Sequence, residues 1–137
     1  MWIAAARSSG RFVIRTIAIV GASRDRGKFG NKAVRAYRHA GCEVFPVHPT
    51  APSIEGLRAF RSVLDIPVGE LDRISIYLPP ATLRPLLDEI AQKPAREVWF
   101  NPGADAPDVV ERARQLGINA ITGCSIVDIG WSPSDLD

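Results

Sequence analysis

The stretch Thr16–Ser23, with the sequence TIAIVGAS, joins a short and almost wholly apolar run to a glycine-containing turn. Such a run is typical of a parallel β-strand that is buried on both faces. A segment with helical spacing of apolar residues follows, begins near Phe29 or Gly30 and stops at Gly41. A strand, a tight turn and a helix in this order predict the opening of a βαβ unit.

The same alternation continues along the chain. Further strands are expected at residues 43–47, 73–78, 95–100 and 118–122. A helix with Thr82 as its N-cap is expected after the third strand, one capped by Asp105 after the fourth, and a short one around residues 56–60. We therefore predict an α/β fold, namely a doubly wound Rossmann-like domain with a five-stranded parallel sheet of strand order 3-2-1-4-5 and helices on both faces.

The length of 137 residues fits one domain. We interpret residues 1–14 as a loosely ordered N-terminal extension, residues 15–130 as the Rossmann-like domain and residues 131–137 as a polar, frayed C-terminal tail.

Composition argues against several classes of function. The net charge of +2 is too small to indicate nucleic acid or an acidic membrane surface as a partner. No apolar run approaches the roughly 20 residues that a membrane-spanning helix needs. Cys42 and Cys124 are expected to be free thiols in a reducing cytoplasm. No spacing fits a metal site, His39 is expected to be a solvated helix residue, and no acid is placed to orient His48, so we predict no catalytic residues.

The first turn is the strongest candidate for a ligand site, because ligands on such sheets bind beyond the carboxyl ends of the strands. Gly21 permits close approach of backbone to a ligand, and the N-terminus of the following helix suits a diphosphate. Ser23 can offer a hydroxyl, and Arg24 and Lys28 can offer positive charge. The alternative is a glycine-containing surface turn with solvated basic side chains.

The turn departs from the fingerprint of NAD-binding proteins. Ser23 stands where the second glycine of G-x-G-x-x-G is expected, and no carboxylate follows the second strand to bind a ribose diol. That strand ends instead in Val47, His48 and Pro49. Apolar groups there and at Leu78–Pro79 would suit a flat adenine, unless the prolines only terminate strands and start helices.

From about Arg15 to Gly130 the chain resembles the small CoA-binding proteins, which are similar to the CoA-binding domain of the succinyl-CoA synthetase alpha subunit. The resemblance lies in the strand and turn ending in GAS, then in VFPVHP, YLPP and VWFNPG, and finally in Cys124. Family members commonly carry asparagine at the position of His48 and a basic residue at that of Thr50. These two departures affect the expected contact to the ribose phosphate.

The resemblance implies a phosphate turn, an adenosine pocket and a loop on the pantetheine side of the ligand. The cofactor-binding residues it supports, together with the reading of the first turn, are Gly21, Ala22, Ser23, Arg24, Lys28, Phe29, Gly30, Val47, His48, Pro49, Leu78, Pro79, Pro80, Asn101 and Gly103.

Three functions follow as hypotheses. The first is noncatalytic binding of coenzyme A or an acyl-CoA. The second is an NAD(P)-binding oxidoreductase or redox sensor. The third is one subunit of a CoA ligase that needs a partner chain. The expected partner is a small nucleotide ligand rather than nucleic acid or a membrane, and self-association or a ligase partner subunit stays open.

Overall fold

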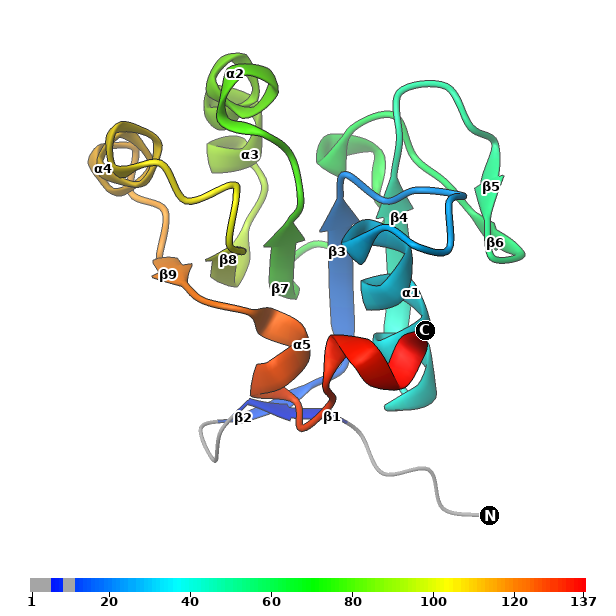
Figure 1. Cartoon of the computed structure of the whole chain (residues 1–137). Coiled ribbons are helices and arrows are strands. Elements are labelled where there is room, and N and C mark those ends of the chain that lie inside the picture. Colours follow the sequence, from blue (N-terminus) through cyan, green and yellow to red (C-terminus); the bar gives the residue numbers. More distant parts are fainter. Residues whose placement is uncertain (1–5, 9–11) are drawn as a thin grey trace.

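A central sheet of five parallel strands organises the molecule (Figure 1). The computed structural model describes residues 6–8 and 12–137. Counted across the sheet, the strands are β4 (Glu43–Val47), β3 (Thr16–Val20), β7 (Leu71–Ile76), β8 (Ala95–Phe100) and β9 (Ala120–Thr122).

Helices cover both faces of this sheet, as predicted. One face carries α1 (Phe29–His39) and α5 (Ser125–Asp128), and the other carries α2 (Pro80–Leu83), α3 (Leu87–Gln92) and α4 (Pro107–Gln115). Alternation along β3 separates the two cores, because successive side chains of a strand point to opposite faces. Ile17 and Ile19 join the core under α1, whereas Ala18 and Val20 join the core under α3 and α4.

The predicted strand order is wrong. Numbered along the chain, the five parallel strands lie in the order 2-1-3-4-5, because β7 pairs with β3 on the edge away from β4. The outer edge of β4 is already occupied by Phe60, whose amide donates to the carbonyl of Pro46 at 2.9 Å and whose carbonyl accepts from the amide of His48 at 2.9 Å. Pro46 also faces this outer edge, so its missing N–H interrupts no bond to β3.

Two expected helices differ from the structure. Residues around 56–60 form the hairpin of β5 (Ser53–Ile54) and β6 (Leu57–Arg58), followed by the 3-10 turn η1 (Val63–Asp65). The helix expected after Thr82 begins instead at Pro80, and a 3-10 turn, η2 (Arg84–Leu86), divides it at Pro85. Proline lacks the N–H of a regular helical bond, which explains the division.

Asp105, the expected cap of the helix after β8, caps no helix. Its carboxylate accepts the amide of Gly103 at 3.2 Å.

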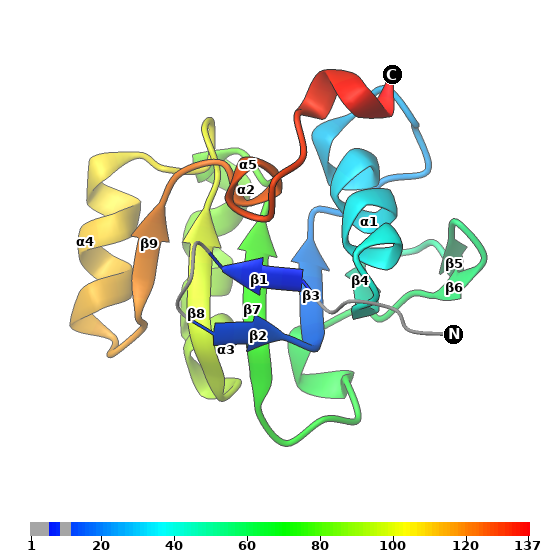
Figure 2. The same ribbon diagram turned by 90° about the horizontal axis from the view of Figure 1, so that it is seen from below.

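The described segments near both termini pack on the α1 face of the sheet. Strands β1 (Ala6–Ser8) and β2 (Phe12–Ile14) form an antiparallel hairpin across this face, with Ala6 and Ile14 buried (Figure 2). The expected loose extension is therefore wrong for these strands, while residues 1–5 and 9–11 lie outside the described residues.

The C-terminal end is a 3-10 turn, η3 (Pro133–Leu136), rather than a frayed tail. Leu136 is buried, and the guanidinium of Arg35 donates to its carbonyl at 2.9 Å. Throughout the described part of the chain, no helix combines the length and apolar character needed to cross a membrane.

Candidate functional site

A pocket of about 420 Å³ opens at the carboxyl ends of β3, β7 and β8. The strand order reverses between β3 and β7, and ligands of doubly wound sheets bind at this reversal. Three loops, which follow those three strands, supply the lining. The lining residues are Gly21, Gly27, Lys28, Phe29, Gly30, Tyr77, Leu78, Pro79, Pro102, Gly103 and Ala104.

The N-terminus of α1 faces this pocket and is open to an anion. Phe29 and Gly30 are its first residues, and the first amides of a helix have no intrahelical acceptor. Lys28 is the N-cap residue, its side chain makes no capping bond, and the first turn carries no acidic residue. Free amides, the helix dipole and the Lys28 ammonium together favour a phosphate group.

Two glycines bring this helix close to the end of β3. Gly21 has a φ of +88°, and a β-carbon there would lie 2.7 Å from the carbonyl oxygen of Tyr77. A β-carbon on Gly30 would lie 2.1 Å from the carbonyl oxygen of Gly21. The narrow floor of the pocket therefore depends on the absence of side chains at both positions.

Other predicted residues of the first turn point elsewhere. Ala22 is buried beneath the turn. The hydroxyl of Ser23 accepts the amide of Asp25 at 3.0 Å, and Nε of Arg24 donates to the carbonyl of Ser53 at 3.1 Å. Ser23 and Arg24 thus lie beside the β5–β6 hairpin and are absent from the pocket lining among the described residues.

The predicted adenine walls are only partly brought together. Leu78 and Pro79 line the pocket, whereas Val47 is buried in the core and Pro49 is exposed beyond β4. Nδ1 of His48 accepts the amides of Thr50 at 3.0 Å and Ala51 at 2.8 Å. Its Nε2 is therefore the ring nitrogen left to donate.

The loop after β8 has two roles. Gly103 lines the pocket, but the side chain of Asn101 is buried and holds the loops together. Its amide nitrogen donates to Ser75 Oγ at 2.8 Å and to the Ile76 carbonyl at 2.9 Å, and its oxygen accepts the Ser125 amide at 2.8 Å. Pro80, also predicted, opens α2 instead of lining the pocket.

Sequence reasoning missed Gly27, Tyr77, Pro102 and Ala104 as lining residues. Each is directly adjacent to a predicted residue, so the correct loops were identified but not every contact. Burial raises the pKa of Tyr77 well above its usual range, and its hydroxyl bonds to Ser125 Oγ at 3.1 Å.

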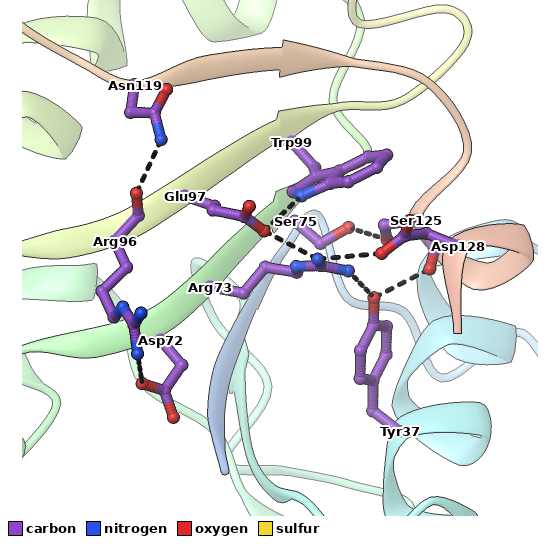
Figure 3. Close-up of polar contacts among 10 residues, drawn as sticks. All are labelled: Tyr37, Asp72, Arg73, Ser75, Arg96, Glu97, Trp99, Asn119, Ser125 and Asp128. Atoms are coloured by element: carbon purple, nitrogen blue, oxygen red, sulfur yellow. Dashed lines mark hydrogen bonds and ion pairs between the residues drawn. The ribbon is translucent and has the colours of Figure 1, made fainter. Parts of the chain in front are cut away.

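Charged side chains form a buried cluster around Arg73, beneath the pocket. The sequence did not predict this cluster, and the one indication of it is a charged residue within an otherwise apolar strand. Arg73 is fully buried, and its Nη2 pairs with Glu97 at 2.7 Å and Asp128 at 2.9 Å (Figure 3). Its Nη1 donates to the hydroxyl of Tyr37 at 3.0 Å, and the guanidinium stacks 4.5 Å from the ring centre of Trp99. The cluster joins β7, β8, α1 and α5.

Comparison with known families agrees with this geometry. A family model described as the CoA binding domain matches residues 15–130. The chain belongs to this family of CoA-binding domains. The match covers all five parallel strands and every loop that lines the pocket.

Relatives of this CoA-binding domain include parts of larger enzymes. The chain is 33% identical over 85 residues to the alpha subunit of the ADP-forming acetate–CoA ligase II of Pyrococcus furiosus, covering 61% of this chain and 18% of that subunit. A structure of the dinucleotide-forming acetyl-coenzyme A synthetase 1 of Ca. Korarchaeum cryptofilum aligns with a TM-score of 0.66 and 26% identity, over 77% of this chain and 25% of the other.

A stand-alone protein of similar size also matches. A conserved hypothetical protein from Pyrococcus furiosus aligns with a TM-score of 0.74 and 31% identity, over 83% of this chain and 98% of that chain. The fold is therefore found both alone and within CoA ligases.

Proposed function

We propose that this chain binds coenzyme A, with the diphosphate of the ligand at the N-terminus of α1. The observation that carries the proposal is the open helix end at the pocket, where Lys28 and the first two residues of α1, Phe29 and Gly30, line the same cavity. Two like-charged phosphates bind well where amides and a cation converge. Membership of the CoA-binding domain family supports this choice of ligand.

The rest of the ligand would follow the walls of the pocket. Leu78 and Pro79 offer apolar surface on one side, and the loop from Pro102 to Ala104 closes the other. A largely apolar pocket with a few convergent polar groups is the usual form of a cofactor site.

The isolated domain is proposed to be noncatalytic. Of the described residues that line the pocket, Lys28 and Tyr77 are the ionisable ones. Tyrosine is protonated at neutral pH, and burial raises the pKa of Tyr77 still further above that pH. General acid–base catalysis works best with a group whose pKa lies near the working pH, and Tyr77 does not supply one.

An NAD(P)-dependent function is the first alternative. The loop after β4 carries no carboxylate, but the hairpin brings Glu55 close to the first turn, which sequence reasoning did not anticipate. Its carboxylate already accepts the side-chain amide of Asn31 at 3.1 Å and pairs with Arg26 at 3.8 Å. A ribose diol would have to displace these contacts, so we favour coenzyme A.

A role as one subunit of a CoA ligase is the second alternative. It is favoured by the two enzyme relatives described above, of whose length the chain spans 18% in one case and 25% in the other. In that role the domain would hold the CoA while a partner chain supplies the reacting groups.

We also propose a cytoplasmic location, where the free thiols of Cys42 and Cys124 would stay reduced.

Ligand-dependent thermal stabilisation tests the proposal. At matched concentrations, CoA should raise the unfolding temperature more than NAD or NADP does, because only a ligand that binds the native state stabilises it. Native mass spectrometry of the purified protein should show CoA or an acyl-CoA as the retained species. Greater stabilisation by NAD would replace this proposal with the oxidoreductase alternative, and acyl-CoA hydrolysis by the pure chain would show that it is catalytic.

A further inference from the structure

A second, smaller recess adjoins the main pocket on the side of α5. It has a volume of about 70 Å³, and Phe29, Tyr77 and Pro102 line both cavities. Asn101 and Cys124 complete its lining. Phe29 stands at the mouth, with its side chain about half exposed.

The polar side chains of Asn101 and Tyr77 at this recess are already hydrogen-bonded to the protein. Both ends of the Asn101 amide are bonded, as described above, and the Tyr77 hydroxyl is bonded to Ser125 Oγ. What remains to face a guest is the ring surface of Phe29 and Tyr77, the ring of Pro102 and the side chain of Cys124. A charged or hydroxylated group placed there would lose its hydration without gaining a partner.

The wall that carries Cys124 is firmly anchored. Ser125, the next residue, is fully buried, and its hydroxyl bonds to Ser75 Oγ at 2.6 Å. Its carbonyl accepts from the Tyr37 hydroxyl at 2.9 Å, and Arg73 ties Tyr37 to Asp128 at the end of α5 (Figure 3). These contacts from three elements keep the recess at its present size.

We infer that this recess selects the group carried on the sulfur of the bound thioester and admits only a short, uncharged acyl group. This inference rests on the proposed binding of CoA. The charged end of CoA belongs at the helix N-terminus, so its uncharged arm is the part that reaches the apolar recess beside Phe29. An apolar cavity of roughly 150 Å³ holds one benzene molecule, so a volume of about 70 Å³ suits only roughly two or three non-hydrogen atoms.

Calorimetric titration with CoA, acetyl-CoA, octanoyl-CoA and succinyl-CoA tests this selection. Acetyl-CoA should bind two- to fourfold more tightly than CoA, because burial of one methyl group is worth about fourfold. Octanoyl-CoA and succinyl-CoA should each bind at least tenfold more weakly than acetyl-CoA, the first for its size and the second for its charge.

Substitutions at Cys124 assign the selection to the recess. Cys124→Leu should fill the recess and remove the preference for acetyl-CoA over CoA. Cys124→Ala should enlarge the recess and reduce the ratio of the affinities for acetyl-CoA and octanoyl-CoA at least threefold. Cys42→Ala is the matched control, since Cys42 is buried in the core under α1 and should leave the order of ligands unchanged.

The outcomes separate the two proposals. If no CoA species binds, the proposed function fails and this inference fails with it. If CoA binds but the four ligands bind equally, or the Cys124 variants keep the wild-type order, only the inference about the recess is overturned.

Discussion

Gly30, the second residue of α1, lies against the carbonyl of Gly21 so closely that a β-carbon on Gly30 would be 2.1 Å from that oxygen. The contact joins the start of the helix to the turn after β3. It holds the free amides of the helix at the floor of the pocket, so stability and ligand binding share one structural feature.

Replacement of Gly30 by alanine should therefore destabilise the fold. We expect Gly30→Ala to lower the free energy of unfolding by about 2 to 3 kcal/mol, because backbone on both sides must move to admit the methyl group. Urea unfolding measures this directly. Gly69→Ala is the control, since nothing lies within 4 Å of a β-carbon there. Equal midpoints for the two variants would contradict the packing argument.

Gly27 offers a cleaner probe of ligand binding than Gly21. A β-carbon on Gly27 meets only the carboxylate of Asp25, at 3.4 Å, whereas one on Gly21 would collide with the Tyr77 backbone. Gly27→Val should lower CoA affinity at least tenfold, about 1.4 kcal/mol, by crowding the pocket it lines. Calorimetry gives the affinity, and a thermal scan should show an unfolding temperature near that of the wild type. Unchanged affinity in the folded variant would place the ligand elsewhere.

Arg24 is the residue we expect to distinguish CoA from dephospho-CoA. Its guanidinium is held beside the segment that follows β4 by the carbonyl of Ser53, and no basic residue stands at Thr50. The 3′-phosphate should add on the order of 1 kcal/mol to binding through this exposed contact. Arg24→Gln should remove most of that advantage, and added salt should shrink it in the wild type. Arg112→Gln, on α4, is the control and should change neither the preference for CoA over dephospho-CoA nor its dependence on salt. If Arg24→Gln keeps the wild-type preference for CoA, Arg24 does not bind the 3′-phosphate.

The buried cluster around Arg73 makes a strong prediction about stability. Arg73→Met would leave the carboxylates of Glu97 and Asp128 buried without their cation, which should cost about 3 to 5 kcal/mol. Arg84→Met removes the exposed pair with Asp108 and should have a much smaller effect on stability, because solvent screens that pair. Denaturant midpoints of the two variants give the comparison. Similar losses would mean that the cluster does not depend on Arg73.

Tyr37 should make the protein sensitive to alkali. Burial raises the pKa of Tyr37 to about 12, whereas a tyrosine of the unfolded chain ionises near 10. Its stabilising effect is therefore complete below about pH 10 and is lost as the pH rises toward 12, by up to about 1.4 kcal/mol per pH unit. Unfolding free energies measured at pH 9, 10 and 11 should show this decline. Tyr37→Phe starts from a lower stability but should decline less steeply; parallel curves would show that another group titrates.

Local signals along the chain predicted most elements. The first helix begins at Phe29, as predicted. Gly41 follows its end with a φ of +87°, a conformation in which glycine is favoured over other residues. The strands at residues 43–47 and 95–100 were also predicted correctly. The predicted helix starts were wrong where a residue can take either of two local roles. Pro85 is compatible with a first helical turn but divides the helix, and Asp105 can cap a helix but accepts the amide of Gly103 instead.

The sequence by itself determined the alternation of strands and helices, the buried character of β3 and the glycine turn that opens α1, because these depend on residues within about one helical turn of each other. Only the tertiary structure decided that β7 pairs on the free edge of β3, since that choice depends on Phe60 occupying the other edge of β4. The same long-range hydrogen bonding turned Arg24 toward the hairpin and placed Tyr77 and Cys124 around one recess. Contacts between segments 29 to 88 residues apart carry no periodic signal in the sequence, and they define the site.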